Sequence, residues 1–118
     1  MKEIISVLPS SDISNDVAWY QKYVGFECIG NDSMYAVLKR DHLSLHLQWH
    51  ANTPDDPLNG GSVIRIWVED IEPIFQEFLS RETISADKLR RNTDWGTHEF
   101  GFYDPNGNAI FIFQDAHI

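Results

Sequence analysis

The chain has 118 residues, enough for one domain to bury a core without disulfide or metal staples. Its 18 acidic residues against 9 basic residues give a net charge of -9. This charge repels phosphate backbones and anionic lipid surfaces, so we expect no nucleic-acid or membrane partner, whereas a cationic ligand would be attracted.

Cysteine use and the N-terminal sequence bear on the compartment. The single cysteine, Cys28, cannot form an internal disulfide, which agrees with a reducing cytoplasm. The first residues, Met-Lys-Glu-Ile-Ile, have no long apolar region and no small-residue cleavage site. No run approaches the roughly 18 apolar residues needed to cross a bilayer. We therefore expect a soluble, cytoplasmic protein.

The first half of the chain predicts the element order βαβββ. The short apolar run Ile4 to Leu8 is a strand that ends before Pro9, because proline removes a ladder donor. Ser14 is expected to cap a helix over Asn15 to Val24, which ends at Gly25. Turn residues separate three further predicted strands: Phe26 to Ile29, Met34 to Arg40 and Leu43 to Trp49.

Residues 51–61 are rich in Pro, Gly, Asn and Asp and predict a surface linker between two halves. Ser62 to Glu69 then reads as a strand. Asp70 and Ile71 open a second helix with Pro73 in its first turn. The apolar face of this helix consists of Ile74, Phe75, Phe78 and Leu79. The second half thus begins as the first one does.

The two halves can be aligned along their length. Asp70-Ile71 repeats Asp12-Ile13 at an offset of 58, whereas Ile110-Phe111-Ile112 matches Leu45-His46-Leu47 at an offset of 65. The second half therefore carries seven extra residues, which we place in a loop around Asp87 to Asp94.

The most informative stretch is Trp95 to Gln114, WGTHEFGFYDPNGNAIFIFQ. Two apolar-rich runs flank Asp104-Pro105-Asn106-Gly107-Asn108, where proline presets a turn dihedral and glycine supplies the positive φ of a tight reversal. The stretch predicts a β-hairpin. Its second arm, Ala109 to Phe113, is aromatic and β-branched and is therefore expected to be buried on at least one face.

This hairpin resembles the closing hairpin of the glyoxalase/bleomycin-resistance superfamily, whose architecture is a tandem βαβββ repeat. The resemblance extends to SVLPSSDISNDVAWYQKYVGFE, RDHLSLHLQ and IRIWVEDIE, and so covers nearly the whole chain. It implies an α+β fold in one domain, residues 1–118, with units at about 1–50 and 62–118. Each unit would be a curled mixed sheet around a cavity, with its helix on the outer face.

Within this superfamily the sequence resembles the bleomycin-resistance-protein branch. Members of that branch catalyse no reaction. They are dimers that hold a flat, cationic glycopeptide antibiotic in grooves at the subunit interface. Their first strand is exchanged between chains about a proline, and Pro9 stands in the corresponding place. The resemblance therefore implies a homodimer, possible exchange of Ile4 to Leu8, and an aromatic, cationic small molecule as partner.

Enzymes of the superfamily hold a divalent ion with four side chains, one from the first strand of each unit and one from its last. Alignment places these four positions at Ile5, His46, Val63 and Phe111. Ile, Val and Phe offer no lone pair to an ion, so a single potential ligand remains where a catalytic site needs three or four. The resemblance therefore implies no metal, no cofactor and no catalytic residue at these positions.

Three histidines, His42, His46 and His50, repeat every four residues. Their segment alternates leucine or tryptophan with polar residues, which is strand period. At about 3.4 Å per residue neighbouring histidines lie roughly 13 Å apart, too far to share an ion. The alternation places His46 and Gln48 opposite the leucine stripe, on the face that lines the cavity if the leucines pack on the helices.

Aromatic residues supply the candidate ligand contacts. The same strand parity assigns Val63, Arg65, Trp67 and Glu69 to the cavity, and Ile64, Ile66 and Val68 to the helix. By the resemblance, Trp67, Trp95 and Tyr35 match ligand-contacting rings of the antibiotic-binding branch; the competing interpretation makes them ordinary core or interface aromatics. The candidate ligand-binding residues are Tyr35, His46, Gln48, Trp67, Trp95 and Phe111.

The leading hypothesis is a metal-free protein that sequesters an aromatic, cationic antibiotic. The alternative is a metal-dependent lyase, isomerase, thiol transferase or dioxygenase whose ligands are displaced to His98, Glu99 or His42. A third interpretation is a member with an unrelated ligand or none. His98 stands where the family commonly has arginine before Glu-Phe, which weakens transfer of the ligand's identity.

Overall fold

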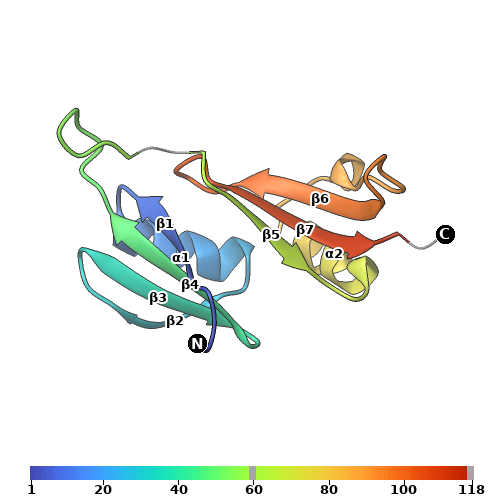
Figure 1. Cartoon of the computed structure of the whole chain (residues 1–118), viewed down its shortest axis with the longest axis horizontal. Helices are drawn as coiled ribbons and strands as arrows, with labels where there is room; N and C mark the ends of the chain where they lie inside the picture. Colours follow the sequence, from blue (N-terminus) through green and yellow to red (C-terminus); the bar gives the residue numbers. More distant parts are fainter. Residues whose placement is uncertain (59–60, 117–118) are drawn as a thin grey trace.

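Two units follow one another along the chain in the computed structural model, which describes residues 1–58 and 61–116 (Figure 1). The first contains β1 (Ser6–Ser10), α1 (Ile13–Tyr23), β2 (Glu27–Asn31), β3 (Tyr35–Arg40) and β4 (Leu43–Trp49). The second contains β5 (Val63–Trp67), α2 (Ile71–Ser80), the 3-10 helix η1 (Ala86–Lys88), β6 (Thr97–Tyr103) and β7 (Ala109–Asp115). The predicted linker, residues 51–61, forms bends and coil up to residue 58, and its residues 59 and 60 lie outside the described part.

Each unit forms its own sheet. In the first the strand order is β1-β4-β3-β2, with β1 parallel to β4 and the other neighbours antiparallel. In the second the order is β5-β7-β6, with β5 parallel to β7 and β6 antiparallel to β7. Both sheets are therefore mixed, as predicted, and the first and last strands of each unit are neighbours.

The second unit departs from the βαβββ order of the first in one element. The predicted extra residues lie between α2 and β6, where they form η1 and a turn. In the place of a strand equivalent to β2, Arg90 makes an isolated antiparallel bridge to Glu99. This bridge is closed by two backbone hydrogen bonds, of 2.8 and 2.9 Å. A loop therefore stands in the second unit where the first unit has the edge strand β2.

The first strand is displaced from its predicted position. It spans Ser6–Ser10 instead of Ile4 to Leu8, and Pro9 lies inside it. The prediction was wrong because β1 is an edge strand, where a proline can turn its missing N–H away from the sheet. The Pro9 carbonyl faces away from β4 as well, since it accepts a hydrogen bond of 3.2 Å from Asn108 Nδ2 of the second unit.

The first helix begins earlier than predicted. It spans Ile13–Tyr23, and its N-cap is Asp12, whose carboxylate accepts the backbone N–H of Asn15 at 3.0 Å. Ser14, the predicted cap, lies in the first turn. Both residue types cap helices well, and the more N-terminal one is used here. Gly25 ends the helix as predicted, with a φ of +74°.

The remaining boundaries agree with the sequence to within two residues. β4 spans Leu43–Trp49 as predicted, and α2 starts at Ile71 behind its N-cap Asp70. The predicted apolar face of α2 is confirmed, since Phe75 and Phe78 are buried and Ile74 and Leu79 pack against the core. The strands predicted at Phe26 to Ile29, Met34 to Arg40 and Ser62 to Glu69 are β2, β3 and β5, each shifted or shortened at its ends.

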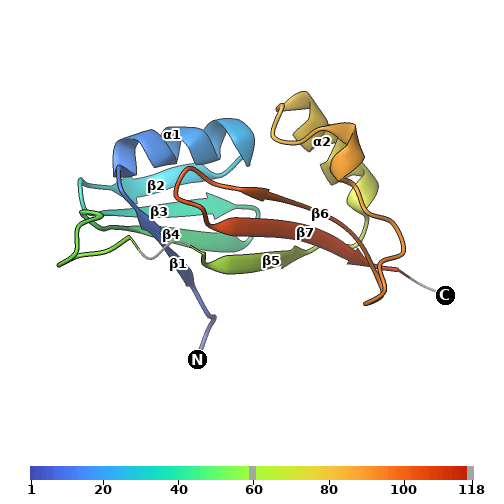
Figure 2. The same ribbon diagram turned by 90° about the horizontal axis from the view of Figure 1, so that it is seen from above.

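Both helices cover the same side of the two sheets (Figure 2). The core lies between helices and sheets and forms one cluster across both units, with Tyr20, Leu38, Leu47, Phe78, Phe100 and Ile110 among its most buried side chains. In the described part of the chain the other side of each sheet carries no helix, and we call these two surfaces the open faces. No helix within residues 1–58 and 61–116 is long and apolar enough to span a membrane.

Polar contacts join the two units at the 104–108 turn. Asp104 is buried and accepts hydrogen bonds from the Tyr20 hydroxyl at 2.6 Å and from two backbone N–H groups of its own turn. Asn106 donates through Nδ2 to Asp16 at 2.7 Å. The turn that closes the second unit is thereby fixed to α1 of the first.

A second junction lies at the other ends of the helices. Arg40 at the end of β3 makes a bidentate pair with Glu77 of α2, at 2.7 and 2.6 Å. Arg81 also contacts Glu77 and donates to the carbonyls of Gln21 and Lys22 at the end of α1. Hydrogen bonds from Arg40 outweigh the effect of burial and lower the pKa of Glu77, so this junction is ionic at neutral pH.

Candidate functional site

The open face of the second sheet presents an aromatic surface. Strand parity places Trp67 of β5 beside Phe113 of β7, and the two are directly paired in the ladder. Their rings are stacked, with centroids 6.4 Å apart and planes 6° apart. Trp67 keeps 71% of its surface exposed, so one large, flat, apolar surface is available to a ligand.

Arg65 lies next to these rings. Its guanidinium carbon is 4.5 Å from the Phe113 ring centroid and 5.4 Å from that of Phe111. Both distances are within the range of cation–π attraction. Arg65 also donates to Glu99 of β6, at 2.9 Å from Nη2 to Oε1. The Arg65 side chain thus reaches from β5 across the central strand β7 to Glu99 on β6.

Glu99 organises the far edge of this face. Its side chain is only 3% exposed, and Oε1 accepts hydrogen bonds from Trp95 Nε1 at 2.7 Å and Thr97 Oγ1 at 2.6 Å in addition to Arg65. Burial alone would raise the pKa of the carboxyl, but these three donors and the arginine charge lower it to about 2. Glu99 is therefore ionised at neutral pH and fixes the half-exposed Trp95 ring through its indole nitrogen.

Phe111 lies flat across the neighbouring strand. It pairs with Gly101 of β6, and a Cβ placed on Gly101 would come within 2.6 Å of two Phe111 ring atoms. Only glycine leaves room for the ring there. The ring borders a hollow of about 290 Å³ that is also lined by Glu99, Tyr103, Lys88 and Arg90.

The open face of the first sheet is more polar. Tyr35 of β3 and His46 of β4 meet edge to face, and the Tyr35 hydroxyl is 2.8 Å from His46 Nδ1. Gln48 is exposed and lies directly across from Tyr35 in the ladder. The parity argument that put His46 and Gln48 opposite the leucines is confirmed, since Leu45 and Leu47 are buried under the helices.

The structure therefore brings the six candidate residues together in two groups. Tyr35, His46 and Gln48 lie on the first open face, and Trp67, Trp95 and Phe111 lie on the second. Within residues 1–58 and 61–116 no hydrogen bond or ring contact joins one group to the other. A single ligand that contacted both groups would have to span the two open faces, or a second chain would have to complete its site.

Phe113 and the supporting role of Glu99 were missed in the sequence. Phe113 could have been found, because it is two residues beyond Phe111 and so shares its face. The role of Glu99 could not, because it depends on contacts between strands and on Trp95, which lies before β6. Arg65 was assigned to the correct face but not to the site.

The aligned metal positions can now be placed. His46 lies directly across from Val7, and Phe111 directly across from Arg65. Ile5 precedes β1, and Val63 is the first residue of β5. His98 and Glu99 are adjacent on β6 and so point to opposite faces, with His98 Nδ1 accepting the Asn92 N–H at 3.0 Å. Within the described ranges no three His, Cys, Asp or Glu side chains are grouped to hold an ion.

Relatives named for bleomycin match almost the whole chain. Bleomycin resistance proteins of Geobacillus stearothermophilus and of Staphylococcus aureus strain MRSA252 are each 25% identical over 128 aligned residues, which cover 97% of this chain and 97% of theirs.

Solved structures show the same fold. A bleomycin-binding protein complexed with bleomycin superposes with a TM-score of 0.77 at 22% identity, over 98% of this chain and 99% of that one. The Streptomyces verticillus bleomycin-binding protein complexed with copper(II)-bleomycin gives a TM-score of 0.71 at 21% identity, over 100% and 98% of the two chains. The family model described as Glyoxalase/Bleomycin resistance protein/Dioxygenase superfamily matches residues 5–112. The chain belongs to this superfamily.

Proposed function

We propose that this protein binds a planar, aromatic antibiotic of the bleomycin type and protects the cell by sequestering it, with no metal of its own and no reaction. The observation that carries the proposal is the exposed stack of Trp67 and Phe113 beside Trp95, whose ring Glu99 holds in place. Such rings bind flat ligands by stacking. The relatives named for bleomycin support this choice of ligand.

The groove would be completed by a second copy of the chain. A single chain leaves the apolar residues Val7, Val63 and Trp67 exposed on its open faces. Apolar groups gathered on uncovered sheet faces favour association. In one chain β1 pairs with its own β4, and Ile4 before it is 96% exposed. If the first strand were exchanged, β1 of each chain would pair with β4 of the partner chain instead of with its own β4.

A cationic ligand would meet a surface that already carries one cation. Arg65 lies over Phe111 and Phe113, but its charge is paired with Glu99. Trp67 and Trp95 carry no such cation and are more exposed. We therefore propose that the aromatic part of the ligand stacks on Trp67 and Trp95. The chain's net charge of -9 would attract the cationic part of the ligand.

The test is a titration of intrinsic tryptophan fluorescence with metal-free bleomycin. Trp67→Ala and Trp95→Ala should each weaken binding about tenfold, because a stacked ring contributes roughly 0.5 to 2 kcal/mol beyond its area. Trp49→Phe is the matched control, since Trp49 lies on the buried side of β4 and donates to the Ser11 carbonyl. If the parent binds and both alanine variants bind equally well, the rings are structural and the site lies elsewhere.

Elemental analysis of the purified protein tests the metal-free part of the proposal separately. Stoichiometric Zn, Ni, Mn or Fe held with micromolar affinity would favour the metal-dependent enzymes of the same superfamily.

A further inference from the structure

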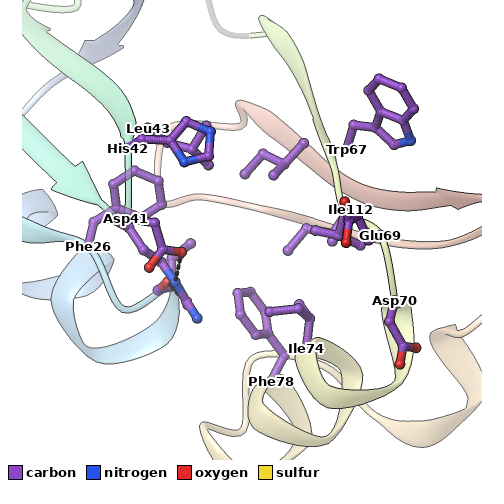
Figure 3. A pocket seen from close by; sticks show the side chains of 14 residues that line it. Phe26, Asp41, His42, Leu43, Trp67, Glu69, Asp70, Ile74, Phe78 and Ile112 are labelled. Carbon is purple, nitrogen blue, oxygen red and sulfur yellow. Dashed lines mark hydrogen bonds and ion pairs between the residues drawn. The ribbon is translucent and has the colours of Figure 1, made fainter.

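A cleft of about 370 Å³ lies between the two units, and Trp67 is one of the residues at its border (Figure 3). Its walls come from five places: the connection between α1 and β2, the β3–β4 turn, the end of β5 with the residues after it, the helix α2 and the strand β7. This volume falls within the roughly 300 to 1,000 Å³ typical of pockets for small molecules. Neither sheet's open face forms it, since Ile66 and Ile112 point to the helix side of the second sheet.

The inner walls of the cleft are apolar. The two units contribute facing side chains, with Phe26 and Leu43 on one side and Ile74, Phe78 and Ile112 on the other. Ile66 of β5 also lines the cleft. Phe26, Phe78 and Ile112 are buried, whereas Leu43, Ile66 and Ile74 are partly exposed to the cleft. A ligand that replaced water against these partly exposed groups would gain apolar burial.

The rim of the cleft is acidic. Asp41, Glu69 and Asp70 line it together with His42, and all four side chains are labelled in Figure 3. Among the lining residues that the structure describes, Arg40 is the one arginine or lysine, and both of its terminal nitrogens are hydrogen-bonded to Glu77. Asp41 is 3.9 Å from Arg40 and its side chain is 77% exposed, so this pair neutralises little charge. The rim therefore keeps a negative potential.

From apolar walls beneath an acidic rim we infer that the cleft is a second binding site, for a small organic cation with an apolar body. The apolar part would lie between Leu43, Ile66 and Ile74, and the ammonium group would lie at the rim near Glu69 and Asp41. The site differs from the proposed antibiotic groove, because it lies between the units, whereas the groove uses the open faces. Among the described lining residues, Trp67 is the one that the two sites share.

The experiment uses three probes that share one apolar body: 4-phenylbutylamine, its neutral analogue 4-phenylbutan-1-ol and its anionic analogue 4-phenylbutyrate. Binding is followed by backbone amide shifts in ¹H–¹⁵N spectra of the full chain at pH 7. We expect shifts at Leu43, Ile66 and Ile74, with the amine binding at least about fivefold more tightly than the alcohol. Equal binding of all three probes, or shifts confined to the open faces, would overturn the inference.

Two kinds of variant locate the site. Ile74→Trp fills the cleft from a partly exposed position on α2 and should abolish amine binding while leaving the bleomycin titration unchanged, so the two proposals fail separately. Met34→Trp, an exposed position at the far end of the first sheet, is its control. If Ile74→Trp instead dissociates a dimer, a second copy covers the cleft and the inference is wrong.

Asp41→Asn and Glu69→Gln test the rim. Each should weaken the amine about two- to fivefold and leave the alcohol unchanged, because an exposed carboxylate attracts a cation only modestly. Asp55→Asn, an exposed carboxylate in the linker, is the control for a general loss of negative charge. An unchanged amine affinity in both rim variants would contradict the assignment of the ammonium group.

Discussion

Glu99 accepts hydrogen bonds from Arg65, Trp95 and Thr97 on the second open face. Its negative charge strengthens all three. The lowered pKa, about 2, means that the folded protein holds this carboxylate ionised where an unfolded chain would protonate it near its usual 4.5. The stability that ionised Glu99 contributes is therefore complete above about pH 5. It disappears as the pH falls from about 4.5 to 2.

We expect Glu99→Gln to lose roughly 3 kcal/mol of unfolding free energy at pH 7. The difference from the parent should vanish near pH 2, where a protonated Glu99 is as neutral as glutamine. Chemical denaturation of both proteins between pH 2 and 7 measures it, and carboxylates such as Glu77, whose pKa is also lowered, cancel in the comparison. Glu27→Gln, an exposed carboxylate of β2, is the control. A stability difference between the parent and Glu99→Gln that did not vary with pH would contradict the lowered pKa of Glu99.

Gly101 is the second single residue on which this face depends. Gly101→Ala should destabilise the protein by about 1 to 3 kcal/mol, because its Cβ would overlap Phe111 and force the ring off the sheet. Thermal unfolding measures the loss, and a ring displaced from Arg65 should also alter the proposed ligand affinity. Gly30→Ala, where a Cβ meets no atom within 4 Å, should cost far less. Equal losses in the two variants would mean that strand propensity, and not the ring, sets the cost.

Among the elements, the 104–108 turn has a structural role that its sequence did not reveal. It was predicted as a hairpin turn and is one, but its three polar side chains are buried against α1 and β1. Burial and the nearby Asp104 carboxylate raise the pKa of Tyr20, so the hydroxyl stays protonated and donates to that carboxylate. The turn of the hairpin that indicated the superfamily therefore joins the units, whereas Trp95, Phe111 and Phe113 of the same hairpin belong to the proposed ligand surface.

Tyr20→Phe should lower the unfolding free energy by about 1 to 3 kcal/mol, since it removes a buried donor and leaves the Asp104 oxygen short of one partner. Urea denaturation measures the loss. Tyr103→Phe is the control, because Tyr103 is 72% exposed. If both variants are equally stable, the turn is held mainly by its backbone.

Strands with a clear alternation of apolar and polar residues could be predicted from the sequence, whereas the position of an edge strand could not. Leu43–Trp49 was placed to the residue because its alternation continues to both ends of the strand. β1 was misplaced because an edge strand tolerates Pro9, and edge position is a property of the whole sheet. The faces of Trp67, His46 and Gln48 followed from parity alone. The separation of the candidate residues into two groups depends on how the units pack, which no local pattern contains.

At the scale of the whole molecule, two open faces remain uncovered. We expect a dimer at micromolar concentration, measured by sedimentation velocity, and Val7→Lys should weaken it by placing a charge on an exposed apolar position of β1. Ala18→Lys, on the exposed side of α1, is the control. A parent that sediments as a 13.6 kDa monomer at high concentration would exclude a groove shared between chains.

The junction at the 104–108 turn also constrains how the chain folds during synthesis. Tyr20 and Pro9 receive their polar partners from residues 84 and 99 positions later. Until the second unit has been made, neither contact can form. Contacts this distant in sequence slow folding because a long loop must be ordered first. We therefore expect the first unit to stay incompletely packed until the closing hairpin emerges.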